Sequence, residues 1–337
     1  MNTPHPSRLA PRLQRGLTIV ELMIGLALGL VITAALLTLF ANASANGQNL
    51  ARSGAQIENG RYVSELLRED LRLAGFYGET SVRGALYATP NPCETTPTGW
   101  SGTPFTLPTA VQGYASTDTL DCLSDRKPGT AALAVRRLDV NVVNPASLAA
   151  GNTQYHVQYT FCVTDVAAPR FIFAKDPSFF VLRNRACAAA NTVRPYLSRI
   201  YYVATCHRCG AGGDTTPTLK RVDLVGNELV TTAIADGVDE LRFEYGFDMD
   251  NNGSADTYLS ALGTVGASTS WANVMTVKAH FITRSLDKAA GSSKLATAQQ
   301  FQLGDTETVQ VAADGYTRKA YSSVIRLINP SGAREAQ

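Results

Sequence analysis

The sequence predicts an α+β protein in which one long N-terminal helix, membrane-spanning in its first half, packs on a β-rich antiparallel C-terminal head domain. Two observations support this prediction. An apolar run at residues 17–41 is followed by residues 42–75, whose apolar side chains recur at helical spacing. Beyond residue 75, short alternating stretches are separated by turn residues, as is typical of strands. We therefore expect three segments, at residues 1–16, 17–75 and 76–337.

The apolar run is long enough to cross a bilayer. Residues 22–41 contain no charged side chain, and a helix of about 20 residues matches a hydrocarbon core of about 30 Å. Arg8, Arg12 and Arg15 precede the run without an acidic residue, a bias that keeps the N-terminus cytoplasmic. A cleaved secretory signal is the alternative, because residues 41–45 read Ala-Asn-Ala-Ser-Ala. The apolar core of such a signal is normally shorter.

Glu21 is the only ionisable side chain within residues 17–41. A carboxylate in hydrocarbon is costly, so residues of this kind usually serve a function. Cleavage after Gly16 would leave a positive amine at the start of an apolar helix, and a carboxylate of a neighbouring subunit would compensate it. Glu21 is therefore a candidate for setting the register of stacked subunits. The alternative is a solvated carboxylate at the edge of a plain membrane anchor.

Residues 16–25 read Gly-Leu-Thr-Ile-Val-Glu-Leu-Met-Ile-Gly and resemble the class III signal of type IV pilins and pseudopilins. The resemblance implies that a prepilin peptidase removes residues 1–16 as a leader by cutting between Gly16 and Leu17. It also implies N-methylation of Leu17, and Glu21 becomes the fifth residue of the mature chain. Family members often carry a proline at the position of Thr38, which this chain lacks.

The helix continues beyond the membrane as an amphipathic segment at residues 42–75. Apolar residues recur at spacings of three, four and seven among charged residues, which places a wide apolar stripe on one face. They are Leu50, Ile57, Val63, Leu66, Leu67, Leu71 and Ala74. Gly75 is the expected helix end. This stripe predicts that the second half of the helix packs on the head.

The head is predicted to be an antiparallel β structure. Leu241, Phe243, Tyr245 and Phe247 alternate with polar residues, as in a half-buried sheet. Residues 89–108 are dense in Pro, Thr, Gly and Ser and indicate an irregular loop. No motif places residues 87–195. Strands are expected at residues 131–138, 154–163, 177–182, 198–204, 219–224, 239–247, 273–284 and 319–328.

The C-terminal half extends the resemblance. Residues 236–248 read Asp-Gly-Val-Asp-Glu-Leu-Arg-Phe-Glu-Tyr-Gly-Phe-Asp, and residues 271–278 read Trp-Ala-Asn-Val-Met-Thr-Val-Lys after an Asp/Asn/Gly loop. This order is similar to the PilW family of type IVa minor pilins, as is Ala-Gly-Phe-Tyr-Gly at residues 74–78. The resemblance implies a low-abundance subunit that primes pilus assembly with other minor pilins and helps present a PilY1-like tip adhesin.

The same resemblance implies a location and a set of partners. Before assembly we expect a single-pass inner-membrane protein with a periplasmic head, and after assembly a subunit of the pilus, at its tip. The expected partners are other minor pilins, the major pilin, the tip adhesin, the prepilin peptidase, the inner-membrane assembly platform and membrane lipid.

Asp248, Asp250, Asn252 and Asp256 form a second candidate site, for calcium. They occupy positions 1, 3, 5 and 9 of a loop with glycine at position 6, and calcium prefers hard oxygen ligands around such a turn. However, Leu259 stands where an EF-hand places a bidentate glutamate, and no helices are predicted around the loop. The alternative is an Asx-rich hairpin turn held by local hydrogen bonds.

All six cysteines follow the membrane segment, where a periplasmic location favours disulfides. Six cysteines allow 15 pairings, and proximity in sequence favours Cys93–Cys122, Cys162–Cys187 and Cys206–Cys209. The last pair also has redox spacing, but a predicted strand followed by a loop is not the βαβ setting of thioredoxin-like motifs. Zinc would need two further ligands, and only His207 lies close in sequence.

Catalytic and nucleic-acid signatures are missing from the sequence. There is no HExxH, GxSxG or phosphate-loop motif, and the four histidines form no triad spacing. The net charge is +2 with scattered Lys and Arg, which gives nucleic acid no basic platform. We predict no enzyme. Two other interpretations remain: a minor pseudopilin of a type II secretion system, and a membrane-anchored calcium-dependent binding protein outside any filament. Chain length and the Asp-rich loop favour the pilus.

Overall fold

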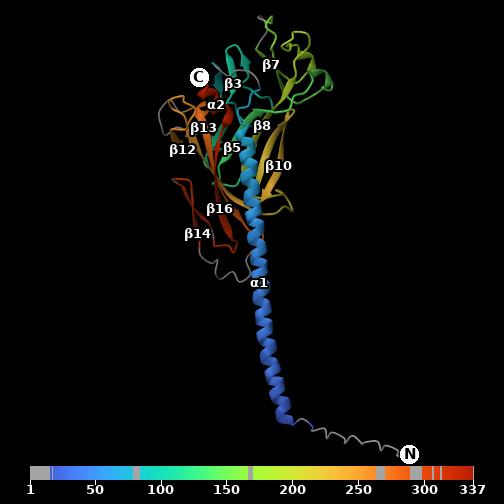
Figure 1. The fold of residues 1–337 in the computed structure, drawn as a ribbon, viewed down its shortest axis with the longest axis vertical. Coiled ribbons are helices and arrows are strands. Elements are labelled where there is room, and N and C mark those ends of the chain that lie inside the picture. Colours follow the sequence, from blue (N-terminus) through green and yellow to red (C-terminus); the bar gives the residue numbers. More distant parts are fainter. Residues whose placement is uncertain are drawn as a thin grey trace, which may run out of the picture. The chain divides into compact units, whose positions relative to one another are not determined.

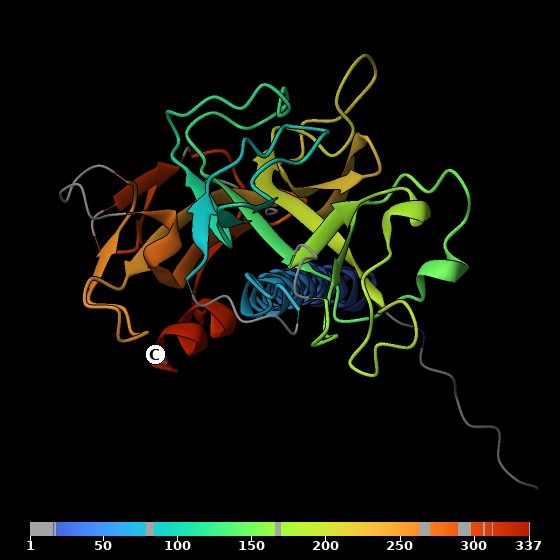
Figure 2. The same cartoon turned by 90° about the horizontal axis from the view of Figure 1, so that it is seen from above.

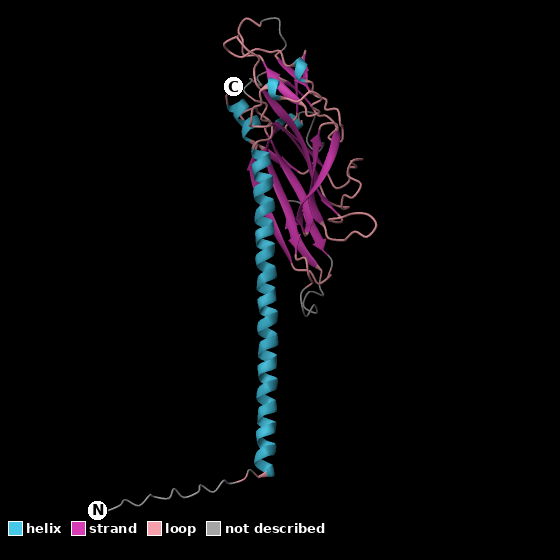
Figure 3. Ribbon diagram, turned by 90° about the vertical axis from the view of Figure 1, so that its right-hand side faces the viewer, coloured by secondary structure: helices cyan, strands magenta, loops and turns pink. Residues whose placement is uncertain are grey.

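The computed structural model describes residues 16, 18–78, 84–165, 170–262, 270–288, 298–305, 307–311 and 313–336. The chain divides into two compact units, residues 1–52 and 53–337. The predicted α+β class is confirmed, because one long N-terminal helix precedes a head built mainly of antiparallel strands (Figure 3).

Helix α1 (Ile19–Arg72) has 54 residues. Its large apolar side chains between Ile19 and Phe40 are all at least 54% exposed. Among the described residues, α1 is the one helix long and apolar enough to cross a membrane. Beyond its last turn, Gly75 has a φ of 71°, and a Cβ added there would lie 2.9 Å from Cβ of Ala110. Glycine is therefore required where the chain leaves the helix.

A seven-stranded antiparallel sheet forms one layer of the head (Figure 1). Strand β8 is central: its first residues pair with β6, and the rest pairs with β5 on one side and β9 on the other. The sheet runs in the order β10-β9-β8-β5-β4, and β7 pairs with β6. Its strands are β4 (Val111–Tyr114), β5 (Ala132–Leu138), β6 (His156–Tyr159), β7 (Phe171–Ala174), β8 (Val193–Ala204), β9 (Thr218–Val225) and β10 (Glu228–Asp236).

A four-stranded antiparallel sheet, in the order β12-β11-β13-β16, forms the other layer. Its strands are β11 (Val238–Phe247), β12 (Thr257–Leu259), β13 (Val274–Arg284) and β16 (Arg318–Arg326). The smaller elements are β1 (Leu86–Ala88), β2 (Ser101–Gly102), β3 (Phe105–Pro108), β14 (Gln299–Leu303), β15 (Glu307–Val311), η1 (Pro145–Ser147), η2 (Pro177–Phe179), η3 (Trp271–Asn273) and α2 (Ile328–Glu335). Strand β1 pairs with β3 in parallel, and β14 and β15 form a hairpin.

One hydrophobic core joins both sheets to the last part of α1. Val63, Leu67 and Leu71 of the helix are fully buried in a cluster with side chains from both sheets, among them Leu133 and Phe243. Figure 2 shows the end of α1 beside the strands, with α2 next to it. The predicted apolar stripe therefore packs on the head from Val63 onward, whereas Leu50 and Ile57 are exposed. The four alternating side chains of β11 that the sequence singled out are all buried in this core.

Several predicted strands are correct and others are not. The strands expected at residues 131–138, 219–224, 239–247 and 273–284 lie within one residue of β5, β9, β11 and β13. The strand expected at residues 177–182 is wrong: Asp176 caps the short helix η2 by accepting a hydrogen bond from the Ser178 amide at 2.9 Å, and Pro177 suits a first helical position. The strand expected at residues 319–328 ends at Arg326, and α2 follows. The loop expected at residues 89–108 contains β2 and β3.

Candidate functional site

The start of α1 holds the predicted processing and assembly residues. Gly16 is exposed, with nothing within 4 Å of where a Cβ would stand, and Leu17 lies outside the described residues. Oε2 of Glu21 accepts hydrogen bonds from the amide and the hydroxyl of Thr18, both at 3.0 Å. In return, Oγ1 of Thr18 accepts a bond from the Glu21 amide at 3.3 Å. This reciprocal pair is a capping box, which satisfies donors that a helix start leaves unpaired.

The capping box changes the interpretation of Glu21 in the free chain. Its carboxylate is held by its own helix start, where a negative charge also suits the helix dipole. Sequence reasoning overlooked Thr18, although a Thr followed three residues later by Glu ahead of an apolar run is a known signature of a helix start.

The second half of α1 is fixed to β16 by close contact. Gln56 donates a hydrogen bond to the carbonyl of Thr317 at 2.7 Å, and the hydroxyl of Tyr321 donates to the carbonyl of Gln56 at 3.0 Å. The ring of Tyr321 lies directly over Gly60, where a Cβ would overlap it. The helix therefore approaches the sheet at a position that only glycine permits.

Asp70, near the end of α1, fixes the helix to the seven-stranded sheet. It is 4% exposed and receives three donors: Nε of Arg137 at 2.9 Å, Nη1 of Arg199 at 2.6 Å, and the hydroxyl of Tyr201 at 2.9 Å. Burial, together with the Asp70 carboxylate, raises the pKa of Tyr201 above its ordinary value. A buried carboxylate needs such partners, so the helix end is specified by charge as well as by apolar packing.

The Asp-rich loop connects β11 and β12, so strands rather than helices flank it. Carboxylate oxygens of Asp248, Asp250 and Asp256 lie within 4.8 Å of one another. Asp248 is fully buried, and its Oδ2 accepts from Nη1 of Arg334 and from the Gly253 amide, both at 2.9 Å. Burial alone would raise the pKa of Asp248, but the hydrogen bonds from Arg334 and Gly253 hold it below its ordinary value.

The other predicted calcium ligands are bonded within the loop. Asp250 accepts a hydrogen bond from the Asn252 amide at 3.1 Å, and Asp256 accepts one from the Met249 amide at 2.7 Å. Such bonds are those of the Asx-rich turn, and the cation of Arg334 opposes a metal ion beside Asp248. Asp248, Asp250 and Asp256 still offer clustered oxygen atoms, so calcium binding by these residues and Asn252 stays a prediction.

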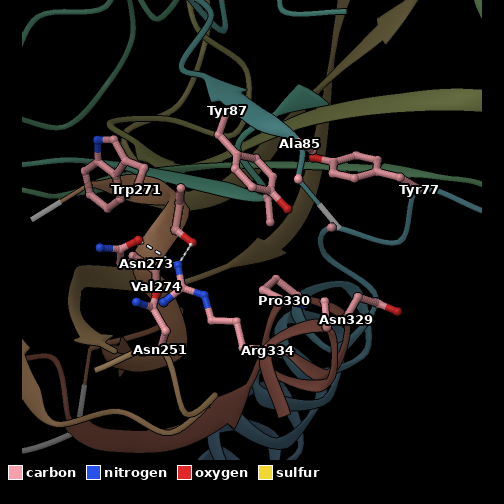
Figure 4. Close-up of a pocket in the computed structure, with 15 residues that line it drawn as sticks. Tyr77, Ala85, Tyr87, Asn251, Trp271, Asn273, Val274, Asn329, Pro330 and Arg334 are labelled. Atoms are coloured by element: carbon pink, nitrogen blue, oxygen red, sulfur yellow. Dashed lines mark hydrogen bonds between the residues drawn. The ribbon is translucent and has the colours of Figure 1, made fainter. Parts of the chain in front are cut away.

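A pocket of about 300 Å³ adjoins this loop (Figure 4). Trp271 and Asn273 line one side, Pro330 and Arg334 of α2 line another, and Tyr87 faces them. The guanidinium of Arg334 donates to Oδ1 of Asn273 at 2.6 Å and to the carbonyl of Ala272 at 3.1 Å. With its bond to Asp248, Arg334 joins the loop, η3 and α2 into one structure. Sequence reasoning missed this role because α2 lies about 80 residues beyond the loop in the chain.

The structure contains three disulfides, which pair the same cysteines as the sequence proximity did. The Cα–Cα distances are 5.6 Å for Cys93–Cys122, 4.9 Å for Cys162–Cys187 and 5.3 Å for Cys206–Cys209, all within the usual range for disulfides.

A capped apolar helix followed by an antiparallel head is the architecture of a membrane-anchored subunit of the pilin class. The comparisons agree: residues 11–37 match the prokaryotic N-terminal methylation motif, and residues 200–329 match the model described as Type IV Pilus-assembly protein W. The chain is therefore a PilW-like type IV minor pilin with a class III prepilin signal. No curated protein and no solved structure matches it.

The match to the pilus-assembly family has two consequences. Its members are structural components of the pilus rather than enzymes. Residues 200–329 run from β8 into the start of α2 and include the Asp-rich loop. Interaction with other pilins and with the pilus machinery follows from this family, and the prepilin motif with the apolar helix indicates membrane anchoring.

Proposed function

We propose that this chain primes type IV pilus assembly together with other minor pilins and helps present a tip adhesin of the PilY1 type. In this proposal residues 1–16 are a leader, residues 17–41 span the inner membrane, residues 42–75 form the amphipathic helix, and residues 76–337 form a periplasmic head. The observation that carries the proposal is the match of residues 200–329 to the pilus-assembly family on a chain that also has the prepilin motif.

Processing is the first step of the proposed function. The peptidase cuts between Gly16 and Leu17 and methylates the new amine of Leu17. The exposure of Gly16 supports access of a protease, as does the finding that no atom of the described residues lies within 4 Å of where its Cβ would stand.

Glu21 then sets the register of the incoming subunit. In the free chain its carboxylate bonds to Thr18 of the same helix. In a filament the amine that cleavage creates on a neighbouring subunit supplies a full positive charge. In a low dielectric this charge is a stronger partner for the Glu21 carboxylate than two neutral hydrogen-bond donors. The proposed pairing is therefore specific to assembly.

Two experiments test this function. Gly16→Ala should leave the chain unprocessed and unable to support piliation, whereas a plain membrane anchor would work unchanged. Cross-linking from an exposed head residue, Val324 of β16, should capture other minor pilins and the tip adhesin. Capture of secretion-system pseudopilins instead would overturn the pilus assignment in favour of the type II secretion alternative.

A further inference from the structure

The Cys206–Cys209 disulfide is the one of the three that has a solvent-exposed cysteine and a lysine ammonium beside a sulfur atom. Cys206 is 7% exposed, whereas Cys209, three residues later, is exposed to solvent. Lys220 of β9 is buried and places its Nζ 3.4 Å from Sγ of Cys209. The sulfur atoms of Cys162 and Cys187, by contrast, contact the neutral hydroxyl of Thr164 at 3.0 and 3.7 Å.

Lys220 is held in this position by a carboxylate. Its Nζ lies 2.7 Å from Oδ2 of Asp125, and the same oxygen lies 3.2 Å from Sγ of Cys209. A cation beside a cysteine stabilises the thiolate, which is the nucleophile and the leaving group in disulfide exchange. The half-buried carboxylate of Asp125, at this distance from Sγ of Cys209, can accept the thiol proton. Lys220 thus supplies the positive charge that a helix start supplies in other redox motifs, while Asp125, whose own negative charge opposes the thiolate, supplies the proton acceptor.

The loop that carries the two cysteines is held independently of their disulfide. The carboxylate of Asp214 accepts hydrogen bonds from the amides of His207 and Arg208, the two residues between the cysteines, both at 2.9 Å. The Asp214 amide donates to the carbonyl of Arg208 at 3.1 Å. Hydrogen bonds from the Arg208, Thr216 and His207 amides, in that order, lower the pKa of Asp214 to about 2, so this brace persists well below neutral pH. The two sulfur atoms therefore stay close after reduction and can close again.

We propose that Cys206–Cys209 is a thiol–disulfide exchange site that oxidises a dithiol, independently of the role in the pilus. One thiolate of the dithiol attacks the exposed Sγ of Cys209. A bond forms between these two sulfurs, the Cys206–Cys209 bond breaks, and its electron pair remains on Cys206, 3.3 Å from the hydroxyl of Thr205. The second thiolate then attacks the first sulfur and releases Cys209 as a thiolate beside Lys220. The dithiol has become a disulfide and its two electrons are on the two cysteines. The protons that the dithiol lost on ionisation went to solvent, and solvent returns protons to the cysteine thiolates.

The proposal is tested first on the unmodified full chain in detergent. Limiting dithiothreitol is added at pH 7, free thiols are alkylated at intervals, and labelled cysteines are mapped by mass spectrometry. Cys206 and Cys209 should become labelled about tenfold sooner than the other four cysteines, and in an unlabelled sample should close again when the reductant is replaced by oxidised glutathione as the two-electron oxidant. Equal or slower opening of this pair would overturn the proposal. The labelling is then repeated with a reduced protein dithiol in place of dithiothreitol. If the natural dithiol belongs to a protein, the protein dithiol should open Cys206–Cys209 faster per thiolate than dithiothreitol does; if it belongs to a small molecule, it should not.

The role of Lys220 is tested with Cys206→Ser, which leaves Cys209 as a free thiol. Lys220→Met in this background should slow alkylation of Cys209 by iodoacetamide at pH 7 about tenfold, and Lys220→Arg should restore the rate. Lys175→Met is the matched control, because Lys175 lies over the ring of Tyr155 elsewhere in the head, and it should change nothing. An unchanged rate in Lys220→Met would overturn the proposal. If that variant does not fold, the mapping on the unmodified chain decides.

Discussion

Glu21 and Thr18 show how one side chain serves two states of a subunit. The carboxylate that closes the capping box in the free chain is the group expected to meet a neighbour's amine in a filament. Thr18 therefore positions Glu21 before assembly, and its hydroxyl makes two of the three hydrogen bonds in the box. The helix start is thus prepared for assembly without an unpaired carboxylate in the membrane.

Glu21→Val should keep the chain in the membrane but reduce its amount in sheared pili, because the apolar helix remains while the charge for the neighbouring amine is lost. Thr18→Val should weaken the helix cap by about 0.5–2 kcal/mol, and Thr18→Ser should preserve it. Quantitative blotting of membrane and pilus fractions measures the effect of Glu21→Val, and thermal unfolding of the helix followed by circular dichroism measures the effect of the Thr18 variants. Wild-type amounts of the Glu21→Val chain in pili would show that Glu21 does not set the register.

Asp250 separates the two interpretations of the Asp-rich loop. If calcium binds, millimolar calcium should give a heat of binding in calorimetry and raise the unfolding temperature, because three carboxylates then share a cation. Asp250→Ala should abolish both effects, while Asp121→Ala, an exposed aspartate outside the loop, should not. Absence of heat in the unmodified chain would leave the Asx-rich turn as the correct interpretation.

At the scale of elements, α1 should respond oppositely to the same substitution at two glycines. Gly60→Ala should destabilise the head by about 1–3 kcal/mol, because the new methyl overlaps the ring of Tyr321. Gly54→Ala should stabilise by about 0.5–1 kcal/mol, because nothing lies within 4 Å and alanine favours helix. Urea unfolding measures both free energies. Equal effects at the two positions would contradict the packing of α1 on β16.

The ion pairs of Arg318 in β16 predict acid sensitivity. Its Nε lies 2.7 Å from Asp239 and its Nη2 lies 2.6 Å from Asp314. The Arg318 hydrogen bond lowers the pKa of Asp314 to about 2, and although burial raises the pKa of Asp239, Lys127 and Arg318 bring it below its ordinary value. A carboxyl group whose pKa is lowered by folding stabilises the folded state at pH values above its unfolded pKa of about 3.9. This stabilisation is lost as the pH falls through the folded pKa.

The unfolding temperature should therefore decline between about pH 4 and pH 2, and Asp314→Asn should reduce the decline. Asp287→Asn, at an exposed residue, is the control. A midpoint that stays level or rises over this interval would contradict the assignment of these pairs.

The elements show which parts of the fold could be predicted. Strands β11 and β13 have 10 and 11 residues, and apolar and polar residues alternate over residues 240–247 and 275–281, so their period reveals them. Strand β7 has only four residues, too few for a period, and β10 buries only one of its nine residues. The sequence predicts a strand at residues 177–182 because most of these residues are apolar. The signal for the short helix η2 is its capping residue, Asp176, which lies just before that stretch.

At the scale of the whole molecule, the sequence predicts the parts of the candidate site that are local and misses those that are distant. Gly16, Glu21 and the Asp-rich loop are continuous motifs. The pairs that Asp70 forms with Arg137 and that Asp248 forms with Arg334 join residues 67 and 86 positions apart, and one sequence carries no signal for such pairs. The same holds for Lys220 beside Cys209.

The most direct test of the central claim, that this PilW-like chain primes pilus assembly, is a count of surface pili by electron microscopy after deletion of its gene. The account predicts that deletion removes most pili, that the wild-type chain restores them, and that the Gly16→Ala chain does not, because priming requires the processed subunit. Normal numbers of pili in the deletion strain would contradict the claim.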